Sequence, residues 1–128
     1  MIDPHNVMVD YLLTQSTLTD SISTRIYPFK LPANATLPAI WFRIDGGESM
    51  IETPLITPSF EFRCYADTEA EAIALDGLLY DVLTSTIAGV DGNITFAENE
   101  VIGQLLPDPD NTRYQMVQSI WSVEMVNE

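Results

Sequence analysis

Two segments in which apolar and polar residues alternate constrain the fold of this chain most. They cover residues 39–45 and 59–65, and in each the apolar side chains stand at every second position. Because successive side chains of a strand point to opposite faces of a sheet, a period of two predicts two strands with one apolar and one polar face. Antiparallel pairing would bring charged side chains of the polar faces together. The expected neighbours are Arg43 with Glu61, or Arg63 with Asp45.

A capped helix is predicted directly after the second strand. Thr68 and Glu71 have the spacing of a capping box, and apolar residues then recur every three to four positions. This pattern predicts a helix over about residues 68–87.

A first helix is predicted at the other end of the chain. Asp3 is a suitable cap, Pro4 suits the first turn, and the apolar spacing continues over about residues 4–14. A further short helical turn is expected near Leu18. Prolines then favour an edge strand or a loop over residues 27–34, because proline lacks the N–H that a sheet ladder requires.

The last part of the chain is expected to add two strands. One covers residues 94–106 with a break near residues 98–100, and the other covers residues 114–126. The predicted order is therefore α-β-β-β-α-β-β. Runs of strands between two helices indicate an α+β fold with a mainly antiparallel sheet of about five strands and two helices packed on it. A length of 128 residues suits a single domain, residues 1–128.

The segment between the first two strands, residues 46–58, is too long for a tight hairpin turn. It either extends the hairpin with its apolar residues folded back on the sheet, or it contacts a neighbouring subunit. Aromatic residues on the outer face of the strands are either ordinary sheet residues or interface anchors. The candidate contact residues are Met50, Ile51, Leu55, Ile56, Trp41 and Tyr65.

The net charge of −14 excludes classes of partner. An acidic chain repels phosphates, which argues against a nucleic-acid reader or a membrane-surface binder. The acidity is concentrated after residue 45, where the net charge is −13. The first residues resemble no secretory signal and no apolar run is long enough to span a membrane, so we expect an intracellular product.

The sequence predicts no enzyme, no cofactor and no metal site. His5 is the only histidine and Cys64 is the only cysteine, so histidine-based triads and multi-cysteine zinc sites are excluded. Cys64 lies on the apolar side of a predicted strand, where cysteine usually acts as a small hydrophobic residue.

Three segments resemble the tail-terminator, or tail-completion, proteins of long-tailed bacteriophages. They are Arg25-Ile26-Tyr27-Pro28, Leu37-Pro38-Ala39-Ile40-Trp41-Phe42, and Phe60-Glu61-Phe62-Arg63-Cys64-Tyr65 leading to the helix at Thr68. The resemblance implies a small α+β domain that forms a ring, commonly sixfold. Such a ring caps the tail tube, stops its polymerisation and joins the tail to the head.

The implied partners are further copies of the chain, the tail tube protein and a head-completion or connector protein. DNA would pass through the ring without specific binding, and the protein would reside in the virion neck after assembly in the bacterial cytoplasm. The acidic composition also fits a DNA mimic that inhibits a host DNA-binding protein. Another adaptor of the head-to-tail neck is a third alternative.

Overall fold

The computed structural model describes residues 3–49, 54–85, 94–107 and 114–126. This part of the chain contains three helices and five strands. In chain order they are α1 (Pro4–Leu13), α2 (Ser16–Ile22), β1 (Ile26–Pro28), β2 (Ala39–Ser49), β3 (Leu55–Ala66), α3 (Glu69–Thr84), β4 (Ile94–Pro107) and β5 (Gln115–Val126).

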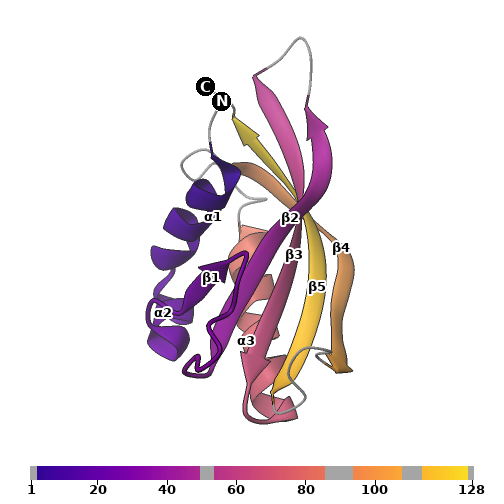
Figure 1. Ribbon diagram of the computed structural model, residues 1–128. Helices are drawn as coiled ribbons and strands as arrows, with labels where there is room; N and C mark the ends of the chain where they lie inside the picture. The colour runs from indigo at the N-terminus through magenta and orange to yellow at the C-terminus, as the bar shows by residue number, and fades with distance from the viewer. Residues whose placement is uncertain (1–2, 50–53, 86–93, 108–113, 127–128) are drawn as a thin grey trace.

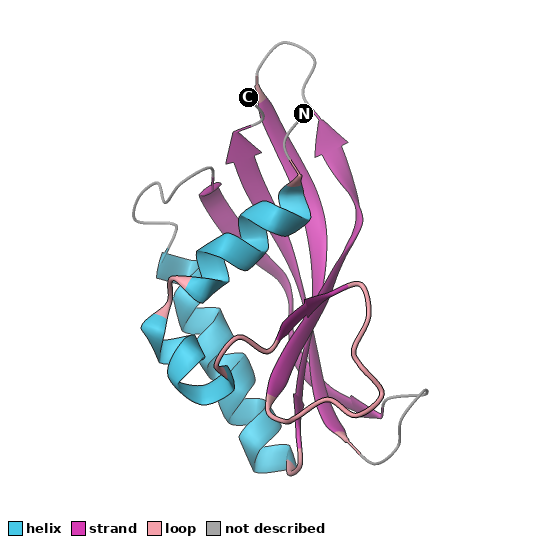
Figure 2. Ribbon diagram, turned by 60° about the vertical axis from the view of Figure 1, so that its left-hand side comes forward, coloured by secondary structure: helices cyan, strands magenta, loops and turns pink. Residues whose placement is uncertain are grey.

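The five strands form one sheet in the order β1-β2-β3-β5-β4. β1 pairs with β2 in parallel, and the other pairs are antiparallel. The helices lie together on one face of the sheet (Figure 1, Figure 2). The expected helices on a mainly antiparallel sheet are therefore confirmed, and β1 and β4 form its two edges.

The number of helices was predicted incorrectly, because α2 is a third helix and the order is α-α-β-β-β-α-β-β. The polar Ser and Thr residues of α2 have modest helix propensity, so the sequence indicates no more than a short turn. Leu18 and Ile22 are nevertheless fully buried, and the packing of α2 against α3 stabilises the helix.

The helix termini follow the predicted capping. The Asp3 side chain accepts a hydrogen bond from the amide of His5, and Thr68 Oγ1 accepts one from the amide of Glu71 at 3.2 Å. These bonds satisfy amides that lack partners within the helix.

β4 is continuous, contrary to the predicted break near residues 98–100. Its pairing with β5 instead shifts register after Asn99 and again after Val101. The Asn99 side-chain amide donates to the carbonyl oxygens of Val101 at 3.0 Å and Ile120 at 3.3 Å, which satisfies backbone groups where the ladder is irregular. Bulges of this kind keep a strand paired while changing its twist.

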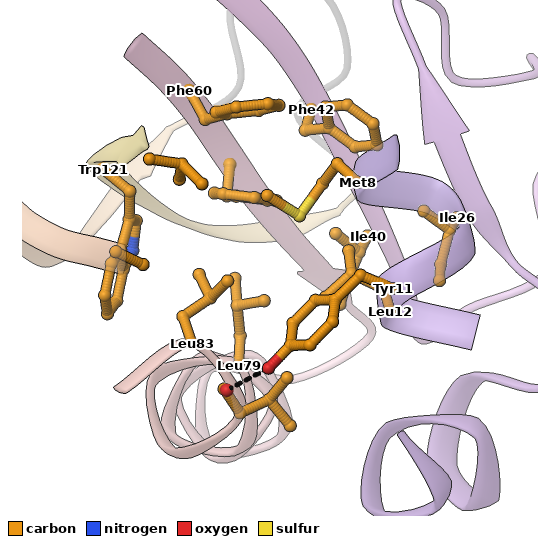
Figure 3. Close-up of a cluster of buried hydrophobic side chains, with 14 of the residues drawn as sticks. Met8, Tyr11, Leu12, Ile26, Ile40, Phe42, Phe60, Leu79, Leu83 and Trp121 are labelled. Carbon is orange, nitrogen blue, oxygen red and sulfur yellow. Dashed lines mark hydrogen bonds between the residues drawn. The ribbon is translucent and has the colours of Figure 1, made fainter. Parts of the chain in front are cut away.

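The main hydrophobic core fills the space between the helices and the sheet (Figure 3). Met8 and Leu12 of α1 and Leu79 and Leu83 of α3 meet the inner face of the strands there. The Tyr11 hydroxyl donates a hydrogen bond to the Val82 carbonyl oxygen at 2.7 Å, so α1 is tied to α3 inside the core.

Candidate functional site

The two aromatic residues predicted as possible interface anchors are buried within the monomer. Trp41 is 8% exposed and Tyr65 is 2% exposed, and both belong to a small second core on the face opposite the helices. The segment between β1 and β2 covers this core with Leu31 and Leu37 (Figure 2). Their positions therefore fit the first of the two predicted alternatives, ordinary sheet residues, and not interface anchors.

A group of charged side chains lies beside the second core on the same face of the sheet. The Glu61 carboxylate accepts hydrogen bonds from Arg43 Nε at 3.1 Å and from Arg63 Nε at 2.8 Å. The predicted pairing of Arg43 with Glu61 is thus confirmed, since the two residues are register partners in β2 and β3. Asp45 lies 3.8 Å from the Arg43 guanidinium instead, while Arg63 binds Glu61 and its guanidinium lies 4.4 Å from the ring centroid of Trp41.

The environment of Glu61 favours its ionised form. Burial alone would raise the pKa of this carboxyl, but hydrogen bonds with Gln118 and Arg63 and the charges of Arg63 and Arg43 outweigh burial and lower the pKa. One acid therefore neutralises much of two cations, which removes them as a binding site for a free anion.

The predicted arm between β2 and β3 is an extension of their hairpin in its described parts. Pairing continues to Ser49 opposite Ile56, after an irregularity between Ile44 and Gly47. Gly47 has φ of 130°, and a Cβ there would collide with the backbone of β3, so the two strands can approach only with glycine at this position.

The apolar candidates of this arm differ in their positions. Ile56 is 4% exposed, pairs with Met125 of β5 and belongs to the main core. Leu55 pairs with Val126 and is only half-buried, so it remains accessible to a partner. Met50 and Ile51 lie outside the described residues, and their role as contact residues stays a prediction.

A second polar group lies between α3 and the sheet. Trp121 Nε1 donates to Ser119 Oγ at 3.2 Å, and Ser119 is hydrogen-bonded to Asp76. Burial raises the pKa of Asp76, although the bond with Ser119 opposes the shift. Burial and the charge of Asp76 also raise the pKa of Cys64, which is therefore a thiol and not a nucleophilic thiolate at neutral pH.

Among the described residues, no cluster of three or more histidine, cysteine or acidic side chains has the arrangement of a metal site. Likewise, none of the described helices has the length and apolar character needed to cross a membrane.

Several exposed apolar side chains were not among the predicted contact residues. Phe29 follows β1, Ile73 and Tyr80 are exposed side chains of α3, and Ile102 lies on the edge strand β4. For α3 the sequence does contain a signal for these exposed residues. Ile73, Gly77 and Tyr80 are spaced by four and three positions, so they form a second stripe along the helix beside the buried one. Phe29 carries no such periodic signal.

Comparison of the chain with models of known protein families gives no match, and comparison with curated proteins gives none either. The functional proposal therefore depends on the sequence resemblance together with the arrangement of the strands and charges.

Proposed function

We propose that this protein is a structural virion protein of the tail-terminator type. It forms a ring, sixfold as the resemblance implies, that caps the phage tail tube, stops tail polymerisation and joins the tail to the head. Its partners are further copies of itself, the tail tube protein and a head-completion or connector protein. It needs no cofactor, catalyses no reaction and resides in the neck of the virion.

The observation that carries this proposal is the arrangement of the three segments that resemble the family. They follow one another within residues 25–65, lie side by side as β1, β2 and β3, and the third leads directly into α3. The resemblance thus concerns one continuous half of the sheet and its connection to a helix.

The charge of the chain supports a conduit for DNA. Residues 46–128 carry a net charge of −13, and many acids of the described part are exposed. A channel lined by acids repels phosphates at distances within the screening length of about 8 Å at physiological ionic strength. Repulsion of this kind lets DNA pass without binding.

Negative-stain electron microscopy of the purified full chain at a series of salt concentrations tests the proposal. Closed rings with a central opening are expected. Open filaments, or monomers at every salt and protein concentration, would contradict it. A DNA mimic would instead remain a monomer or dimer and bind a basic protein partner, so the same images with sedimentation data separate the two functions.

A different neck adaptor would also form rings. Adding the protein to tails that were assembled without it separates these two functions, because a terminator binds the end of the tail tube and stops its growth. A neck adaptor added to the same tails would leave tube length unchanged.

A further inference from the structure

Phe29 is held at one edge of the sheet in a strained turn. Its φ is 74°, and the amide of Lys30 donates to the Pro28 carbonyl oxygen at 2.9 Å, which closes a three-residue turn. Such a turn is rare, and a bulky residue with positive φ is an outlier. One face of the Phe29 ring stacks on His5 with 4.0 Å between centroids, yet the side chain is 65% exposed. Strained residues of this kind cluster at functional positions.

A shallow apolar groove of about 580 Å³ lies at the other edge, between α3 and β4. Ile73 and Tyr80 line it from α3, and Ile102, which is 72% exposed, lines it from β4. Tyr80 is held in place by an edge contact with Trp121, with 5.6 Å between ring centroids. The groove is therefore part of the folded surface and does not depend on side-chain rearrangement.

Gly77 lies in this groove, and the monomer gives no reason for a glycine there. A Cβ built at Gly77 meets nothing within 4 Å, so a larger residue fits the fold. Glycine inside a helix is less stable than alanine. The lack of a side chain does, however, leave room in the groove for a group from another molecule.

The charges of the two edges are complementary. Asp76 and Asp81 flank the groove, whereas Lys30, the only lysine of the chain, is exposed beside Phe29. Within the described residues no ion pair involves Lys30, while Arg43 and Arg63 are both paired with Glu61.

We propose that Phe29 and Lys30 of one copy dock into the groove between α3 and β4 of the next copy. Phe29 contacts Ile73, Tyr80 and Ile102, and Lys30 lies against Asp81. The inference rests on the proposed function, because it requires copies of the chain to assemble. It adds which two surfaces of the copies meet. Because β1 and β4 lie at opposite edges of the sheet, the contact is head-to-tail and generates a closed ring when the rotation between copies closes (Figure 1).

Two substitutions remove the contact and leave the monomer folded. Gly77→Gln fills the groove with a good helix former. Phe29→Gly removes the aromatic side chain, and relief of the positive φ offsets its lost contact with His5. Each should raise the dissociation constant for self-association by about tenfold or more, as for other buried interface anchors. Sedimentation velocity of the full chain measures this change. Urea unfolding of each variant should show a midpoint equal to or above that of the wild type.

Charge reversal identifies the two surfaces as partners of one another. Lys30→Glu and Asp81→Lys should each weaken self-association, and the double variant should recover it, because the attractive pair is restored with opposite sign. Asp10→Lys is the matched control for Asp81→Lys, since it makes the same change of charge at an exposed position of α1. Recovery in the double variant beyond the effect of Asp10→Lys supports the contact. Equal behaviour of all charge variants would overturn it.

A photo-crosslinking amino acid, p-benzoylphenylalanine, at position 29 gives an independent test. We expect a covalent dimer whose crosslinked peptide falls within residues 69–84 or 94–107. A crosslink to another segment, or rings unaffected by Gly77→Gln and Phe29→Gly, would overturn this contact and leave the proposed function intact. A wild-type chain that stays monomeric at every salt and protein concentration would contradict both.

Discussion

At the scale of single residues, Glu61 joins two arginines through its buried carboxylate. Its carboxylate is almost fully buried, with a side chain 6% exposed, and it accepts hydrogen bonds from Arg43 and Arg63. Replacement by an uncharged group would leave Arg63 without its carboxylate partner and Arg43 with only the exposed Asp45, 3.8 Å away. Such a change lowers stability, because the guanidinium groups of Arg43 and Arg63 are positioned to donate to the Glu61 carboxylate and would lose that acceptor.

We expect Glu61→Gln to lower the free energy of unfolding by about 1 to 3 kcal/mol at pH 7. The folded-state pKa of Glu61 lies below its ordinary value of 4.5. The stabilisation is therefore complete above the unfolded pKa and is lost as pH falls through the folded pKa. Urea unfolding of both proteins between pH 7 and pH 3 measures the difference, which should shrink at the acidic end. A difference independent of pH would show that lost packing, not charge, causes the change.

The sequence predicts the Arg43–Glu61 contact as one of two alternatives, because alternation places the charged side chains of both strands on one face. It does not choose between registers that keep this face, and the observed register selects Arg43 with Glu61. The sequence leaves open whether Trp41 and Tyr65 are ordinary sheet residues or exposed interface anchors. Their cover comes from Leu31 and Leu37, in a proline-containing segment whose path depends on tertiary contacts and not on any periodic pattern. A face that is polar in one strand can therefore hold a small core where a loop crosses it.

At the scale of elements, the hairpin of β2 and β3 contains both residues of the hydrophobic core and residues accessible to a partner subunit. Ile56→Ala should destabilise the protein by about 2 to 5 kcal/mol, because its side chain is buried in the main core and its loss leaves a cavity. Leu55→Ala is the matched control at the adjacent position, where the side chain is only half-buried, and it should cost clearly less. Urea unfolding of the two variants provides the comparison.

Equal losses of stability for the two variants would mean that Leu55 also belongs to the monomer core, and it would then be withdrawn as a contact residue. The sequence treats residues 46–58 as one unit, because neither length nor composition shows where pairing ends. Pairing with β5, a strand about 70 positions further along the chain, decides that Ile56 is internal.

The helices differ in how far the sequence determines them. α3 has a capping box and a long apolar stripe, so local signals agree with its packing. α2 is a helix of 7 residues without a side-chain cap, and only the burial of Leu18 and Ile22 stabilises it. Short helices of this kind are determined by tertiary packing, which a local pattern does not contain.

At the scale of the whole molecule, the net charge of −14 governs how copies approach one another and how they meet DNA. We expect no measurable affinity of the wild-type protein for duplex DNA at moderate salt, because binding to phosphates requires cations that release counterions. Arg43 and Arg63 are paired with Glu61, so the only arginine or lysine residues outside an ion pair in the described part of the chain are Arg25 and Lys30. Fluorescence anisotropy with labelled duplex DNA measures this, and binding would contradict the conduit.

Salt should strengthen ring assembly. Six copies carry about −84 formal charges, and their mutual repulsion opposes association at low ionic strength. Screening weakens this repulsion as salt rises to physiological levels, whereas burial of Phe29 in an apolar groove is nearly independent of salt. The single attraction of Lys30 for Asp81 weakens too, but it is small beside the repulsion between whole subunits. Sedimentation velocity across a salt series should therefore show the oligomer growing with salt, and dissociation of rings on adding salt would mean that ion pairs, not apolar contacts, hold the subunits together.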